Sequence, residues 1–160
     1  MSDHTIKSLP LHNLRGHTVQ LLSQGQNQEA IEFMQRHMSD FYASCRPSVR
    51  SGILSLKFIA HLKASEHLKA IELIQKSELK TAPFPSCDIS GKPVLCKADD
   101  LTRLFCKSSL SSVDEDNDDD CLLVGRKHRD AVCSFVNKEM LRYENQQIKS
   151  PLNPENNKRR

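Results

Sequence analysis

The chain has 160 residues, enough for one domain with its own hydrophobic core. It has no tryptophan, 5% aromatic residues and five glycines, which disfavours a β-sandwich or barrel and favours an all-α fold. The net charge is +3, although residues 114–120 hold six of the 20 acidic residues. The basic residues are scattered without a nucleic-acid-binding motif, and no stretch reaches the roughly 18 apolar residues of a membrane span. We therefore expect neither a nucleic-acid partner nor a membrane-spanning segment.

The first predicted elements form a helical hairpin. After a flexible N-terminus, residues 1–10, apolar residues recur at helical spacing as far as Gly25, which predicts a helix over residues 11–24. Asn27 is a suitable N-cap for a second helix, which ends before Pro47. The apolar stripe of the second helix consists of Ala30, Ile31, Met34, Met38 and Phe41.

A second predicted hairpin completes the region 11–79. Ser48 can cap a third helix that has apolar residues on more than one face, so we expect this helix at the centre of the domain. Ser65 then starts a fourth helix, which ends near Pro83 and Pro85. The stripe of the fourth helix consists of Leu68, Ile71, Ile74 and Leu79.

The remainder of the chain is expected to be less regular. Residues 80–98 contain three prolines and a glycine and predict a long loop. Residues 99–145 then supply a short helix, capped by Asp99 or Asp100, and a last helix over 126–145. Between these helices an acidic loop, residues 108–121, has little to bury, and the tail 146–160 is polar, so both are expected to be disordered. The loop residues expected to touch the core are Val94 and Leu95.

One string in the chain recurs at an offset of 40 residues. The sequence AIEFMQ at residues 30–35 returns as AIELIQ at residues 70–75, and the same offset aligns Leu22 with Leu62. A period near 40 residues is typical of stacked helical pairs, because one pair cannot bury its apolar stripe alone. The repeat predicts a protein that holds a partner rather than one that catalyses a reaction.

Short motifs within the predicted helices resemble those of a known family. Residues 21–25 (LLSQG), 28–31 (QEAI), 54–59 (LSLKFI) and 69–71 (KAI) resemble a CTLH motif. Further along the chain, two more segments resemble a CRA domain. These are residues 100–105 (DLTRLF) and 128–141 (HRDAVCSFVNKEML).

The resemblance to CTLH–CRA proteins implies an α-helical scaffold without catalytic residues. The family includes Ran-binding protein M-like proteins and other scaffold subunits of the GID/CTLH ubiquitin ligase. The resemblance therefore implies other CTLH/CRA or RING-bearing subunits as partners. It also implies a location in the cytoplasm and nucleus. The resemblance leaves open whether the chain forms homo-oligomers or hetero-oligomers. Compared with the family pattern, the chain lacks a preceding LisH helix pair and the last CRA helices, so it is either a divergent minimal member or a truncated product.

The partner-binding residues are expected on helix faces left uncovered. They lie on the last helix and on the outer face of the first, and are Val132, Phe135, Val136, Met140, Leu14 and Leu21. The basic residues 126–129 begin the last helix, where cations are disfavoured by the helix dipole, so we expect them to face outward.

Metal, cofactor and catalytic sites are not expected. The cysteines lack C-x₂-C pairing, and the only H-x₅-H pair, His61 and His67, spans a predicted helix boundary. Residues 114–120 resemble the start of an EF-hand loop. A 12-residue loop that begins at Asp114, however, would have Asp119 at position 6, where glycine is required, and Gly125 at position 12, where glutamate is required. The six cysteines are expected as thiols, since the chain begins without a signal-peptide pattern.

Two alternatives to the ligase scaffold stay open. One is a helical adaptor of an unrelated nuclear or cytoplasmic complex, and the other is a thiol or metal enzyme. Separately, Ser111 and Ser112 precede the acidic run and fit an acid-directed kinase; an intact mass from cells without added phosphate would dismiss this hypothesis.

Overall fold

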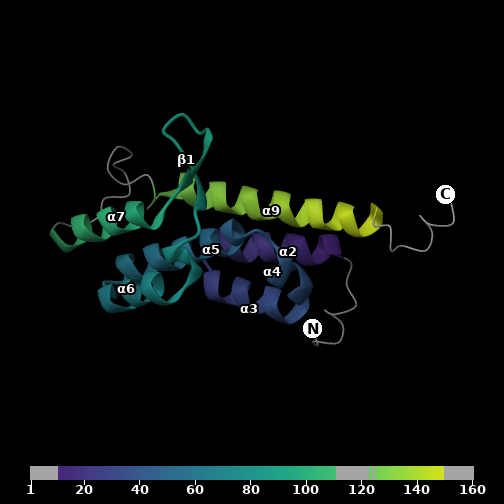
Figure 1. Ribbon diagram of the computed structural model, residues 1–160, viewed down its shortest axis with the longest axis horizontal. Helices are drawn as coiled ribbons and strands as arrows, with labels where there is room; N and C mark the ends of the chain where they lie inside the picture. Colours follow the sequence, from purple (N-terminus) through teal and green to yellow (C-terminus); the bar gives the residue numbers. More distant parts are fainter. Residues whose placement is uncertain (1–10, 111–122, 124, 150–160) are drawn as a thin grey trace.

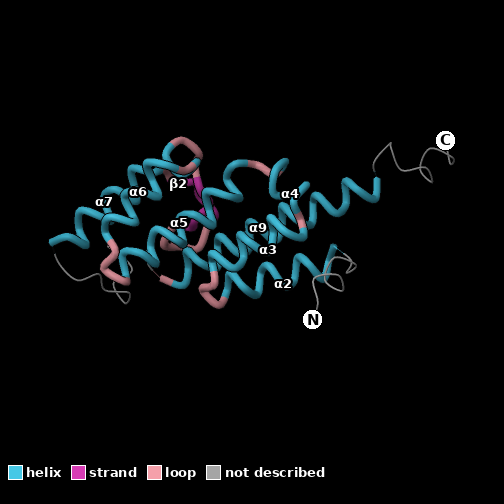
Figure 2. Tube along the Cα trace, turned by 90° about the horizontal axis from the view of Figure 1, so that it is seen from below, coloured by secondary structure: helices cyan, strands magenta, loops and turns pink. Residues whose placement is uncertain are grey.

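The computed structural model describes residues 11–110, 123 and 125–149, which are mostly helical (Figures 1 and 2). The helices are α2 (Leu11–Ser23), α3 (Asn27–His37), α4 (Ser39–Ser44), α5 (Pro47–Lys63), α6 (His67–Lys76), the 3₁₀ turn η1 (Glu78–Lys80), α7 (Ala98–Leu110) and α9 (Arg126–Lys149). A hairpin of β1 (Phe84–Cys87) and β2 (Pro93–Cys96) projects from the helices beside α9. No helix in these described ranges is long and apolar enough to cross a membrane.

The 40-residue repeat extends to the backbone hydrogen bonds. In the first hairpin the N–H of Gln26 donates to Leu21 O (2.9 Å), and in the second the N–H of Glu66 donates to His61 O (2.8 Å). The preceding residues, Gly25 and Ser65, both lie at positive φ, 82° and 60°. This is the Schellman termination of a helix, repeated at the predicted offset. Each hairpin is therefore helix, left-handed turn, helix.

The predicted second helix is interrupted. Met38 leaves the helical region (φ −137°, ψ 41°), so that α3 and α4 are separate helices. Met38 still forms backbone hydrogen bonds to both helices, because Met38 N–H donates to Met34 O of α3 and Met38 O accepts from Tyr42 N–H of α4. The change of direction places both Met38 and Phe41 in the core.

The prediction of a loop over residues 80–98 is wrong, because this segment contains the β1–β2 hairpin. Gly91 at φ 89° closes the turn, and Asp88 N–H donates to Lys92 O (2.9 Å). Antiparallel pairs alternate between hydrogen-bonded and non-hydrogen-bonded types, so the observed register places Pro85 and Pro93 in non-hydrogen-bonded pairs. Proline lacks an N–H, and these are the positions where β1 and β2 tolerate it.

Two helix ends also differ from the predictions. Helix α7 continues to Leu110 and α9 to Lys149, although we expected disorder from residues 108 and 146. Helix α7 begins at Ala98, and Asp100 accepts a hydrogen bond from Lys97 N–H (2.9 Å). The predictions for residues 1–10, for most of the acidic loop with Ser111 and Ser112, and for residues 150–160 lie outside the described residues.

Helix α5 lies at the centre, as predicted. Buried residues on several of its faces join two hydrophobic clusters. The first cluster lies among α2, α3, α4, α5 and α9, and the second among α5, α6, η1, β1 and α7. Helix α2 is also linked to α9 through Arg15, which contacts Glu144 (2.7 Å) and Asn137 (2.8 Å).

Candidate protein-docking groove

The sequence-predicted partner residues are already covered by the chain itself. Val132, Val136, Met140 and Leu14 are buried in the first cluster. Leu21 and Phe135 are partly buried and pack against the same cluster. The prediction of an uncovered face is therefore wrong for the four buried residues, because α2 and α9 use their apolar sides on the shared core.

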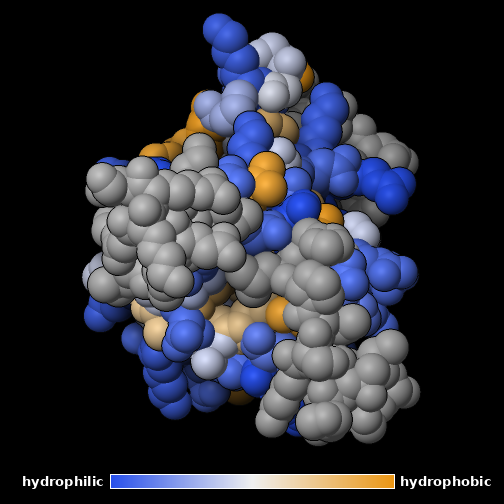
Figure 3. Space-filling view, turned by 90° about the vertical axis from the view of Figure 1, so that its right-hand side faces the viewer, coloured by the Kyte–Doolittle hydropathy of each residue, from blue (hydrophilic) through white to orange (hydrophobic). Residues whose placement is uncertain are grey.

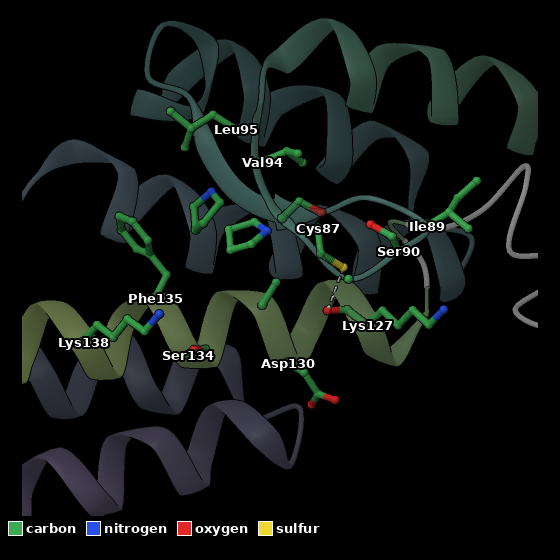
Figure 4. Close-up of a pocket in the computed structure, with 15 residues that line it drawn as sticks. Cys87, Ile89, Ser90, Val94, Leu95, Lys127, Asp130, Ser134, Phe135 and Lys138 are labelled. Atoms are coloured by element: carbon green, nitrogen blue, oxygen red, sulfur yellow. Dashed lines mark hydrogen bonds between the residues drawn. The ribbon is translucent and has the colours of Figure 1, made fainter.

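An open groove lies instead between the β1–β2 hairpin and α9 (Figure 4). Its volume is about 580 Å³. One wall is the hairpin, including its turn, and the other is a stripe on α9 that runs from Lys127 to Lys138. Phe135 is the one residue of the predicted set that lines this groove.

The hairpin wall presents exposed aliphatic side chains. Ile89 and Leu95 are each 63% exposed, and Val94 lies between them along the groove (Figure 4). The expectation that Val94 and Leu95 touch the core is thus wrong. Large aliphatic side chains gathered over a cavity are typical of a surface that a partner covers.

The rim of the groove is charged. Lys127 and Lys138 lie eleven positions apart on α9, about 16 Å along a helix, and Asp130 lies between them. Within the described chain we find no salt bridge to either lysine. The groove therefore combines an apolar wall with a net positive edge.

A fully buried histidine fixes the hairpin above α9. His128 Nε2 lies 2.9 Å from Ser55 Oγ of α5, and His128 Nδ1 lies 2.9 Å from Ser86 Oγ of β1. Ser55 already donates to Gly52 O (2.6 Å), so its oxygen accepts from Nε2–H and Ser86 donates to Nδ1. His128 thus joins three elements with one neutral ring.

Burial, with a smaller contribution from Arg129, lowers the pKa of His128 to about 4. Such an imidazole is a weak base at neutral pH, and Ser86 is itself buried. This arrangement suits a positioning role rather than proton transfer. Sequence reasoning missed His128 because a lone histidine in a basic run gives no periodic signal.

Arg129 does not face outward as expected for residues 126–129. Its guanidinium donates to Leu22 O (2.7 Å) and Asn27 Oδ1 (3.4 Å). Asn27 was the predicted N-cap of the second helix, but it is buried as the first residue of α3. Arg129 thus ties the turn of the first hairpin to α9.

Two thiols lie on the hairpin strands, Cys87 on β1 and Cys96 on β2. Burial raises the pKa of Cys87 and of Cys96, and a raised pKa reduces the thiolate fraction. The described cysteines are free, whereas Cys121 lies outside the described residues. Among the described residues no three His, Cys, Asp or Glu side chains are grouped to hold a metal ion.

Comparisons with known proteins give no relative for this chain: no protein-family model, curated protein or solved structure matches it.

Proposed function

We propose that this protein is a non-catalytic protein-interaction subunit that holds a partner in the groove between the β1–β2 hairpin and α9. The observation that carries the proposal is the pair of exposed side chains, Ile89 and Leu95, over an open cavity. Burying each is worth at most about 1.5 to 3 kcal/mol. The two anchors therefore supply only part of the roughly 8 kcal/mol of a micromolar contact, and the rest must come from further contacts along the groove.

The occupant we propose is a partner segment with apolar side chains between acidic residues. The apolar residues would contact Ile89, Leu95 and Phe135, and the acidic residues would pair with Lys127 and Lys138. Addition of a strand to β2 is disfavoured, because the alternation of pairs leaves Pro93 on the free edge without an N–H to donate. Recognition therefore relies on side chains.

We further propose that the assembly is a CTLH-type ubiquitin ligase, in which this chain is a scaffold or regulatory subunit. This step rests on the resemblance of the helical motifs. The alternative is a helical adaptor of an unrelated nuclear or cytoplasmic complex. The groove serves either function, so the identity of co-purifying proteins separates the two.

The test is affinity purification of the full chain from cells with quantitative mass spectrometry. We expect RING-bearing ligase subunits to co-purify and to be lost at least ten-fold when Ile89→Asp and Leu95→Asp are combined. Lys127→Glu with Lys138→Glu should weaken the same interaction and reduce its salt sensitivity.

The matched control is Leu141→Asp, a change of an exposed leucine on α9 that does not line the groove. If it removes the same subunits as the groove variant, the groove is not the docking site. Recovery of an unrelated complex that depends on Leu95 would keep the groove and reject the ligase.

A further inference from the structure

A second exposed apolar surface lies at the α6–α7 end of the molecule. Leu68 of α6 is 80% exposed and Ile71 is 36% exposed. Between α6 and α7 lies a cavity of about 300 Å³, lined by Ile71, Ile74, Thr102 and Phe105. We call Leu68 and these four residues the α6–α7 face. None of them lines the docking groove.

The internal repeat shows what this face lacks. In the first hairpin, α3 packs against α5, and Ile31 and Met34 are buried. The equivalent residues of the second hairpin are Ile71 and Ile74, which are exposed and partly buried respectively. In the described chain, the ring of Phe105 on α7 lies 5.4 Å from that of His67 on α6. No described helix covers α6 as α5 covers α3.

Helix α5, which covers α3 in the first hairpin, presents aliphatic side chains at a regular spacing. On α5, Ile53 and Leu56 belong to the same cluster as Ile31 and Met34. They are three residues apart, so they share one side of the helix. A helix that covers α6 in the same way therefore needs bulky aliphatic residues at this spacing.

Helix α2 of a second copy does not supply these residues. By the repeat, α2 is the counterpart of α5, and Asn13 and Gly16 stand where α5 has Ile53 and Leu56. Both α2 residues are exposed. The described surface at the end that carries α2, α3 and the last turns of α9 is mostly hydrophilic (Figure 3). Stacking of α2 from a second copy on α6 would therefore bring Asn13 and Gly16, rather than two bulky aliphatic residues, against α6.

We propose that the α6–α7 face binds an amphipathic helix of a different protein, which packs on α6 as α5 packs on α3. Helix-in-groove recognition uses apolar anchors at a spacing of three or four residues. The proposal is independent of the groove and does not require a ubiquitin ligase.

The probe we choose is a helix-stabilised, fluorescent peptide of residues 47–63, the α5 sequence. Fluorescence anisotropy with the full chain should show binding that weakens at least ten-fold with Ile71→Asp and several-fold with Leu68→Asp. Leu95→Asp, in the groove, should leave the affinity unchanged. A peptide with Ile53→Asn and Leu56→Gly, which copies α2 at these two positions, should not bind.

A second measurement guards against variants that fail to fold. Cys106 is exposed and lines the same cavity, so the α5 peptide should protect it from alkylation in the unaltered chain, whereas the α2-like peptide should not. Absence of peptide binding, equal binding to the Ile71→Asp chain or an unprotected Cys106 would each overturn the proposal. A dimer of the full chain that Ile71→Asp dissociates would replace the foreign helix with a second copy.

Discussion

The two helical hairpins share a backbone but differ in what covers them. Both turn through a left-handed residue with the same pair of hydrogen bonds. The first hairpin is enclosed by α5 and α9, and the second leaves part of α6 bare. The repeat therefore determines the local path of the chain, whereas burial at a repeat position depends on the next element in the stack.

The largest expected effect is a difference in stability loss between alanine variants at the equivalent residues Ile31 and Ile71. Ile31→Ala should lower the free energy of unfolding by about 2 to 4 kcal/mol, because Ile31 is only 7% exposed within the first cluster. Ile71→Ala should cost about 1 kcal/mol or less, since much of Ile71 already meets water. Urea unfolding of the two variants measures both values. Equal losses would mean that the two hairpins are covered alike.

The next effect concerns the joint between the hairpin strands and α9. His128 has a folded pKa of about 4, below its ordinary value of 6.5, so the unfolded chain binds more protons between these pH values. The contribution of His128 is complete above pH 6.5 and is lost as the pH falls toward 4, by about 3 kcal/mol.

Urea unfolding from pH 7 to pH 4 measures this dependence, and His128→Gln is the control. The variant should be less stable at pH 7 and should show a shallower loss on acidification. A pH profile identical to that of the unaltered chain would show that His128 is not the group that titrates.

The turn of the first hairpin offers a smaller effect. Gly25→Ala places a side chain at φ 82°, which should cost about 1 to 2 kcal/mol. The nearest atoms to the added Cβ are those of the Arg129 guanidinium at 3.8 Å, an ordinary contact, so the cost arises in the backbone. Thermal unfolding would detect it, and an unchanged Tm would contradict the left-handed turn.

The turn of the second hairpin should respond in the opposite direction. Ser65→Gly removes the strain of a non-glycine residue at φ 60° and should stabilise the chain by about 0.5 to 1 kcal/mol. Ser65→Ala at the same site should not stabilise it. If both variants destabilise, the serine side chain contributes a contact that offsets its backbone cost.

Local patterns in the sequence predicted most of the helices. Helix α2 was bounded by apolar spacing and Gly25, and the central place of α5 followed from its several apolar faces. The hairpin was missed because its prolines were interpreted as loop residues. Two short apolar runs around a turn that contains Gly91 were the available signal.

The candidate site was harder to predict than the helices. Periodicity identifies an apolar stripe but not the element that covers it, so Val132 and Met140 were expected outside and lie in the core. Ile89 and Leu95 stand in a short, irregular segment without periodic neighbours. The strand that precedes Ile89 is linked to α9 by the hydrogen bond from Ser86 to His128, a contact 42 residues apart in the sequence.

The position of α5 makes the molecule a single cooperative unit. Its N-terminal half belongs to the first cluster and its C-terminal half to the second, and Leu54 packs against both. Separation of either half of the molecule would expose α5, so the amides of this helix should exchange with solvent only through global unfolding. A partner bound at either end would slow that exchange throughout the helix.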